Sequence, residues 1–105
     1  MYQIFRTEAF IRQFDKIIPK NLIGDIECRV HRLAENPFLG KPLGNHIWEI
    51  KADKFRIYYS IFDKELIVLF ISVSDKKHQQ DKIDALKRID FSSFIEKYKK
   101  SEDIT

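Results

Sequence analysis

The chain has 105 residues, of which 44% are hydrophobic and 33% are charged. This composition fits a single domain with one core, which buries about 60–70% of the surface that the unfolded chain exposes. The formal charge of +3 and the pI near 9.0 favour an anionic partner. The longest apolar run, residues 66–71, is too short to span a bilayer, and the start MYQIFRTEAF lacks the apolar core of a signal peptide. We therefore expect a cytoplasmic protein that does not associate with membranes.

Cysteine and histidine usage argues against several kinds of site. Cys28 is the single cysteine, which excludes an intramolecular disulfide, and we expect it to be a buried thiol on a helix. His31 suits a helix surface, and His46 opens a strand with no second metal-type ligand at a suitable spacing. The sequence therefore predicts no metal site and no cofactor. It also contains no Ser/His/Asp or Cys/His catalytic pattern.

The first half of the chain predicts a strand followed by two helices and a loop. Residues 2–6 alternate weakly and suit a short strand. Thr7 can cap a helix that Pro19 ends. The apolar positions of this helix follow a helical repeat: Phe10, Phe14, Ile17 and Ile18. Those of a second helix do the same: Leu22, Ile26, Val30 and Leu33. The segment NPFLGKPLG, residues 36–44, then predicts a rigid loop.

Three strands are predicted after this loop, at residues 46–52, 55–62 and 65–73. Tight turns at Asp53-Lys54 and Asp63-Lys64 connect them. One face of the resulting sheet then gathers apolar side chains: Trp48, Ile50, Ile57, Tyr59, Ile61, Leu66, Val68 and Phe70. The opposite face, which carries Arg56, also holds Ile67, Leu69 and Ile71. That face therefore needs partial cover from another element.

The register of the first hairpin decides which basic residues meet. A two-residue or four-residue connection places Lys51 opposite Arg56 and Glu49 opposite Tyr58, whereas a three-residue connection would place Lys51 beside Phe55. We choose the even connection because a one-residue slip would move every apolar group to the wrong face. Like charges directly opposite one another destabilise a sheet. Lys51 and Arg56 therefore either extend into solvent or hold an anion between them.

Two further helices are predicted at the C-terminal end. Residues 76–89 form a helix with three inward positions, Ile83, Leu86 and Ile89. A last helix begins at Phe91 and can cover the Arg56 face through an apolar stripe that reaches Tyr98. The expected order is β-α-α-β-β-β-α-α, an α+β fold with a mainly antiparallel sheet of about four strands. Residues 1–105 make one domain, with 91–105 as a C-terminal helical extension.

This order, together with the segment KFRIYYSIFDKELIVLFISV and the basic residues that follow it, resembles the RelE/ParE superfamily of toxins from type II toxin–antitoxin systems. The resemblance covers residues 2 to about 90, and the segment from Phe91 is similar to the longer HigB-type or phage-derived members. It implies a RelE-like fold and a cognate antitoxin protein as partner. For the RelE branch it implies a ribosome-dependent endoribonuclease that cuts messenger RNA and so inhibits translation.

The resemblance also implies which residues carry the reaction. The family's strand Arg falls on Arg56, the Lys of the preceding strand on Lys51, and the basic residues after the last strand on Lys76 and His78. Lys82 stands where RelE members carry a late Tyr, so the identity of the proton donor stays open.

These catalytic candidates suit the attack of a 2′-OH on the adjacent phosphate. The guanidinium of Arg56 can bind two phosphate oxygens, which Lys does less well. Lys51 is the candidate base and His78 the candidate acid, since imidazole changes its charge near neutral pH. We expect Arg56→Ala to abolish toxicity without disturbing the core.

Four further residues are candidate RNA contacts: Lys54, Tyr58, Lys77 and Lys82. Tyr58 can stack on a nucleobase or, alternatively, pack under the C-terminal helix.

Two other functions remain open. The ParE branch shares the fold and poisons DNA gyrase without cutting RNA. A non-catalytic homologue that only binds an antitoxin is the third possibility, and the Lys82 departure favours it. The cluster of Lys76, Lys77 and His78, together with Arg56, favours the nuclease.

Overall fold

The structure is a computed structural model that describes residues 1–90. The predicted C-terminal extension, 91–105, and its last helix lie outside the described residues. Five strands form one sheet in the order β1-β5-β4-β3-β2. Their bounds are β1 Gln3–Arg6, β2 Lys41–Gly44, β3 Ile47–Ala52, β4 Phe55–Phe62 and β5 Ile67–Asp75. β1 pairs parallel with β5, and the other neighbours are antiparallel. The α+β class is confirmed, with five strands in place of about four.

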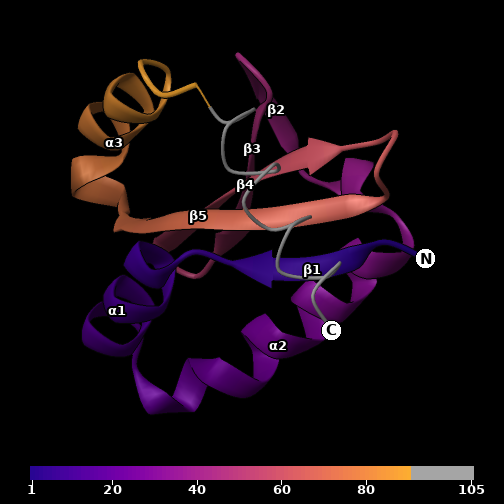
Figure 1. The fold of residues 1–105 in the computed structure, drawn as a ribbon. Helices are drawn as coiled ribbons and strands as arrows, with labels where there is room; N and C mark the ends of the chain where they lie inside the picture. Colours follow the sequence, from indigo (N-terminus) through magenta and orange to yellow (C-terminus); the bar gives the residue numbers. More distant parts are fainter. Residues whose placement is uncertain (91–105) are drawn as a thin grey trace.

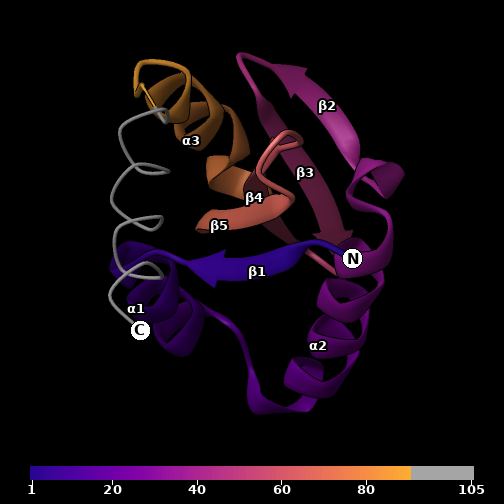
Figure 2. The same ribbon diagram turned by 45° about the vertical axis from the view of Figure 1, so that its right-hand side comes forward.

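Two helices, α1 (Glu8–Ile17) and α2 (Lys20–Glu35), cover one face of the sheet (Figures 1 and 2). The predicted cap is present, because the Thr7 Oγ1 accepts a hydrogen bond from the Phe10 backbone N–H at 3.0 Å. α1 ends before Pro19, as expected. The larger core forms between these helices and the sheet, and its members include Phe10, Ile26, Val30, Leu33, Ile57, Tyr59, Val68 and Phe70.

The predicted register of the first hairpin is confirmed. Lys51 pairs with Arg56 and Glu49 with Tyr58, across a two-residue turn in which Asp53 has φ +56°. The second turn is longer than predicted, so β5 begins at Ile67. Leu66 lies in that turn at φ +57° and is 49% exposed, so its expected place on the apolar face is wrong. The longer turn shifts the pairing by an even number of residues, which leaves the two faces of β5 as predicted.

A β-bulge interrupts the pairing of β4 with β5. Tyr58 pairs with Ser72 but Tyr59 pairs with Phe70, so Ile71 is the extra residue. Side chains of the first helical segment satisfy the backbone around the bulge. The Thr7 hydroxyl donates to the Ile71 carbonyl at 3.2 Å, and the Gln13 Oε1 accepts from the Val73 backbone N–H at 3.0 Å. The bulge therefore holds α1 against β5.

The strand β2 falls in the segment that we predicted to be a loop. Residues 37–39 form the short 3₁₀ helix η1, and after Gly40 the strand Lys41–Gly44 pairs with β3. Pro42 and Gly44 concealed this strand in the sequence. Proline is tolerated here because β2 has one hydrogen-bonded neighbour and lies at the edge of the sheet.

The opposite face of the sheet is covered by α3 (Gln79–Leu86), which follows the 3₁₀ turn η2 (Lys76–His78). A second core forms there from Ile47, Tyr58, Leu69, Ile71, Ile83 and Leu86. The predicted helix over 76–89 is thus shorter, and Ile89 is 40% exposed rather than inward. None of the helices within residues 1–90 is long and apolar enough to cross a bilayer.

Cys28 is exposed, so the expected buried thiol is wrong. The buried stripe of α2 runs through Ile26 and Val30, and Cys28 lies two residues from each, which turns it to the opposite side of the helix.

Candidate functional site

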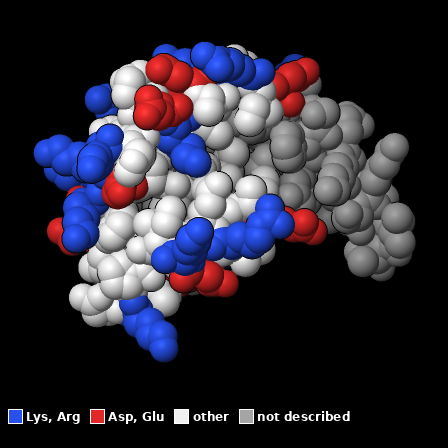
Figure 3. Space-filling view, turned by 90° about the vertical axis from the view of Figure 1, so that its left-hand side faces the viewer, with Lys and Arg blue, Asp and Glu red and all other residues white. Residues whose placement is uncertain are grey.

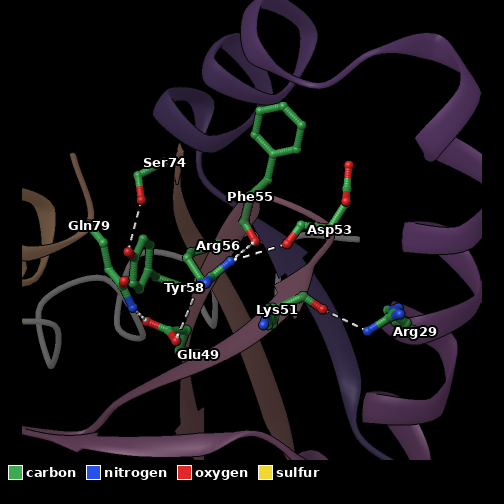
Figure 4. Close-up of polar contacts among 9 residues, drawn as sticks. All are labelled: Arg29, Glu49, Lys51, Asp53, Phe55, Arg56, Tyr58, Ser74 and Gln79. Atoms are coloured by element: carbon green, nitrogen blue, oxygen red, sulfur yellow. Dashed lines mark hydrogen bonds and ion pairs between the residues drawn. The ribbon is translucent and has the colours of Figure 1, made fainter. Parts of the chain in front are cut away.

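The guanidinium of Arg56 is buried and held by its own hairpin. Arg56 is 6% exposed, and its Nη1 donates hydrogen bonds to the carbonyls of Phe55 at 3.0 Å and Asp53 at 3.3 Å. Its Nε lies 3.8 Å from the Glu49 Oε1, which makes an ion pair (Figure 4). Arg56 is therefore fixed in direction, and its charge faces a carboxylate rather than open solvent.

Glu49 links this hairpin to α3. It is 7% exposed, and its Oε2 accepts a hydrogen bond from the Gln79 Nε2 at 2.9 Å. Figure 4 shows Glu49 between Gln79 and Arg56. A buried charge is tolerated only when it is paired and hydrogen-bonded, and both conditions hold for Glu49. From the sequence, Glu49 was expected opposite Tyr58 and close enough to Lys51 and Arg56 to offset part of their charge, but it was not a predicted site residue. The signal for a site was its diagonal position to Arg56 on the same face of the sheet.

Arg56 and Glu49 form part of the wall of a cavity of about 480 Å³ between α2, the β2–β3 edge and α3. The cations that line it are Arg29, Lys41, Lys51 and Arg56, against the single acid Glu49. Arg29 reaches across from α2 and donates to the Lys51 carbonyl at 2.6 Å. The Lys51 side chain is exposed. The excess of positive charge suits an anionic ligand.

Three other predicted residues, Lys54, Lys76 and Lys77, border a separate cavity of about 750 Å³. All three are exposed, and the Lys76 backbone N–H donates to the Lys54 carbonyl at 2.9 Å. Figure 3 views the side of the molecule that lies at the left in Figure 1, where basic side chains are spread in several groups with acidic ones beside them. These lysines form a solvated surface rather than an enclosed site.

His78 and Lys82 border a third cavity, against α1. The imidazole Nδ1 of His78 lies 2.8 Å from the Asp75 Oδ1, which also accepts the His78 backbone N–H at 2.9 Å. These bonds, the side-chain one first, hold the pKa of Asp75 below its ordinary value. The residues that line the Glu49–Arg56 cavity do not include His78. Of the predicted catalytic residues, the structure thus brings Lys51 and Arg56 to one cavity, and puts His78 and Lys76 elsewhere.

Tyr58 is fully buried, and its hydroxyl lies 2.8 Å from the Ser74 Oγ. Burial raises the pKa of Tyr58. Its ring packs in the core beneath α3, so in this structure it offers no face for stacking on a base. Within residues 1–90, no group of three or more His, Cys, Asp or Glu could hold a metal ion.

Comparisons with known proteins identify the family. Residues 4–80 match the model of the ParE toxin of the type II toxin–antitoxin system parDE. A mutant Escherichia coli RelE toxin in the free state is similar in fold, with a TM-score of 0.69, 22% identity and coverage of 84% of this chain and 97% of that one. The RelBE2 toxin–antitoxin complex of Mycobacterium tuberculosis gives a TM-score of 0.60 at 24% identity, covering 70% of this chain and 96% of that one.

The archaeal RelE–RelB complex of Pyrococcus horikoshii matches at a TM-score of 0.61 and 11% identity, over 71% of this chain and 94% of that one. No curated protein sequence matches the chain. The structural matches have less than 25% sequence identity and support the fold alone. The family model covers most of the chain and therefore identifies the family. The chain therefore belongs to the ParE toxin family, within the RelE/ParE superfamily of toxins from type II toxin–antitoxin systems.

Proposed function

We propose that this toxin is an endoribonuclease that cleaves messenger RNA and thereby inhibits translation. The observation that carries the proposal is the buried Glu49–Arg56 pair at the wall of a cation-lined cavity. A carboxylate that can accept a proton stands beside a guanidinium that can bind a phosphate. Both are held by neighbouring atoms, and pre-positioned groups of this kind need little rearrangement during a reaction.

The reaction that fits is attack of a ribose 2′-oxygen on the adjacent phosphorus. Glu49 takes the 2′-OH proton, the new 2′-O–P bond forms, and Arg56 binds the negative charge that grows on the phosphate oxygens. The P–O5′ bond breaks, and the leaving 5′-oxygen takes up a proton. The products are a 2′,3′-cyclic phosphate and a 5′-OH, so no water is consumed in this step.

The geometry favours a reassignment of roles within this mechanism. Lys51 was the expected base and His78 the expected acid. Glu49 is the better base, because it is a carboxylate fixed by two contacts. Lys51 lines the same cavity as Glu49, so its ammonium is the better-placed donor to the 5′-oxygen. Lys76 and His78 then act from neighbouring surfaces, where they join Lys54, Lys77 and Lys82 as contacts to the RNA backbone.

A cognate antitoxin protein is the proposed partner, as in the RelBE complexes that share this fold. From the RelE resemblance we propose that the substrate is messenger RNA on the ribosome, which places the toxin's action in the cytoplasm.

The test is to incubate the purified toxin with free messenger RNA and with translating ribosomes, and to map the ends of the products. We expect new 2′,3′-cyclic phosphate ends, with cleavage stronger on the ribosome. Intact RNA under both conditions would refute the proposal. Cleavage of free RNA at the same rate as on the ribosome would support the nuclease activity and contradict its dependence on the ribosome.

Inhibition of DNA gyrase is the second candidate, and the match to the ParE toxin model is the observation that favours it. The closed pairing of Arg56 with Glu49 also suits a protein in which that guanidinium is structural. A supercoiling assay with purified gyrase decides. Inhibition together with intact RNA would replace the nuclease proposal by this one.

A further inference from the structure

Two large apolar side chains are exposed next to the Glu49–Arg56 cavity. Phe38 is 50% exposed and Leu39 is 61% exposed, and both belong to η1 (Pro37–Leu39). Leu39 lines the cavity itself, whereas Phe38 packs edge-on against Trp48 at 5.5 Å between ring centroids. An exposed leucine by itself is ordinary. This one lies beside a cationic cavity on a segment that the fold holds in place.

The position of η1 is fixed by three separate features. The Asn36 side chain accepts the Phe38 backbone N–H at 3.2 Å, and the buried Tyr59 hydroxyl donates to the Pro37 carbonyl at 2.7 Å. At Gly40 a Cβ would lie 2.8 Å from the Glu49 carbonyl and also against the Tyr59 hydroxyl, so a side chain does not fit. Leu39 is therefore presented from a rigid support rather than from a loose loop.

The cavity thus combines two kinds of wall. Lys41 and Lys51 are exposed cations that can contact phosphate, and Leu39 is an apolar surface beside them. A ligand that satisfies both walls carries negative charge on one part and a flat, weakly polar face on another, as a nucleotide does. A cavity of about 480 Å³ is also of the size that holds a small organic ligand.

We propose that Leu39 is the nucleobase contact of the RNA site, and that Lys41 and Lys51 hold the flanking phosphates. This inference rests on the proposed ribonuclease function and names the subsite for the base, the role that the sequence suggested for Tyr58. The base lies against Leu39 while the backbone passes the Glu49–Arg56 pair. The contact is apolar rather than hydrogen-bonded. It therefore favours RNA that carries a base at this position but discriminates little between the four bases.

The test measures the binding of two short RNA oligomers by fluorescence anisotropy. Both carry 2′-O-methyl groups, which block 2′-attack, and one has abasic sugars in place of its nucleosides. The readout is the ratio of the two dissociation constants, in which the phosphate contribution cancels. For the full-length toxin we expect the abasic oligomer to bind at least about fivefold more weakly, the effect of one apolar contact of this size.

Three variants make the measurement specific. Leu39→Ser should bring the ratio close to one. Ile23→Ser, at an apolar residue of α2 that is 37% exposed, is the matched control and should keep the parental ratio. Lys41→Ala should weaken the binding of both oligomers alike and lower the salt slope by about 0.7, the value for one phosphate contact to a single strand.

A parental ratio of one, or a ratio that Leu39→Ser leaves unchanged, would overturn the inference. So would a Leu39→Ser protein that binds RNA normally but has lost affinity for its antitoxin, because η1 would then be a protein-binding surface. Failure of the proposed function looks different. If the toxin shows the Leu39-dependent ratio but leaves RNA uncut, the base contact is supported and the nuclease proposal is refuted.

Discussion

The cavity around Glu49 and Arg56 and the surface around Lys54, Lys76 and Lys77 both carry cations, but they hold them differently. In the cavity, Arg56 and Glu49 are 6% and 7% exposed. Two carbonyls hold Arg56, the Gln79 amide holds Glu49, and the two side chains pair with each other. On the surface the three lysines are exposed to water. A buried ion pair has a desolvation cost that only a well-defined geometry offsets. Exposed charges are screened by salt and water and can change position. This difference supports the proposal that the reaction takes place in the first region and that the second attracts RNA.

Loss of Arg56 should produce the largest change in stability. Arg56→Ala leaves the Glu49 carboxylate buried without its ion-pair partner, and we expect the free energy of unfolding to fall by about 3 kcal/mol. The burial of Arg56 thus replaces the expectation from the sequence that the variant would leave the core undisturbed with a new prediction. Urea denaturation followed by circular dichroism measures the change.

Lys77→Ala is the control for Arg56→Ala, since an exposed lysine should change stability by no more than about 0.5 kcal/mol. If both substitutions changed the free energy of unfolding by equally small amounts, the buried pair would not differ energetically from the exposed surface.

Removal of the Tyr59 hydroxyl should have a smaller effect that depends on pH. Tyr59→Phe loses the hydrogen bond to Pro37, which we expect to cost about 1 kcal/mol near neutral pH. Burial raises the pKa of Tyr59 to about 12. The folded chain thus keeps a proton that the unfolded chain loses above pH about 10, so parental stability falls as pH rises from about 10 to about 12. In Tyr59→Phe this fall should be weaker.

Denaturation curves collected across that pH range test the second part of this prediction. Tyr58→Phe should weaken the alkaline fall as well, because burial also raises the pKa of Tyr58, whose hydroxyl contacts Ser74 and not η1. An undiminished alkaline fall in Tyr59→Phe would show that the Tyr59 hydroxyl does not set it.

The smallest expected effect concerns the exposed lysines. Lys77→Ala should weaken RNA binding and reduce its salt slope by about 0.7, while the rate of cleavage at saturating RNA stays unchanged. Binding measured at several salt concentrations gives the slope. Unchanged affinity and slope would show that Lys77 does not contact the RNA. A large loss of the cleavage rate at saturating RNA would show that the reaction depends on the exposed lysines.

The sequence allowed the faces of the strands and the register of the first hairpin to be predicted because both depend on local rules. The parity of a turn decides which residues share a face, so Lys51 opposite Arg56 followed from the two-residue turn at Asp53. The strand β2 was not predicted, because Pro42 and Gly44 are typical of loops and the pairing with β3 cannot be read from the sequence. The bulge at Ile71 escaped for a similar reason, since Thr7 and Gln13 from a distant segment satisfy it.

The candidate site could be predicted only in part. The family pattern pointed to Arg56 and Lys51, and both line the cavity. Glu49 needed the position of α3, because Gln79 at the first residue of that helix holds its carboxylate. Burial also lay beyond the sequence: alternation gave Tyr58 a face, but only the packing of Ile83 and Leu86 shows that this face is sealed.

The most direct test of the account is the cleavage rate of Glu49→Gln on saturating RNA, beside the parent and Lys77→Ala. Glutamine keeps the shape of the side chain and its contact to Gln79 but cannot take the 2′-OH proton. We expect the rate to fall by about 10²–10⁴-fold, the usual contribution of a general base, with Lys77→Ala close to the parent. A Glu49→Gln protein that is folded and cleaves RNA at the parental rate would contradict the account.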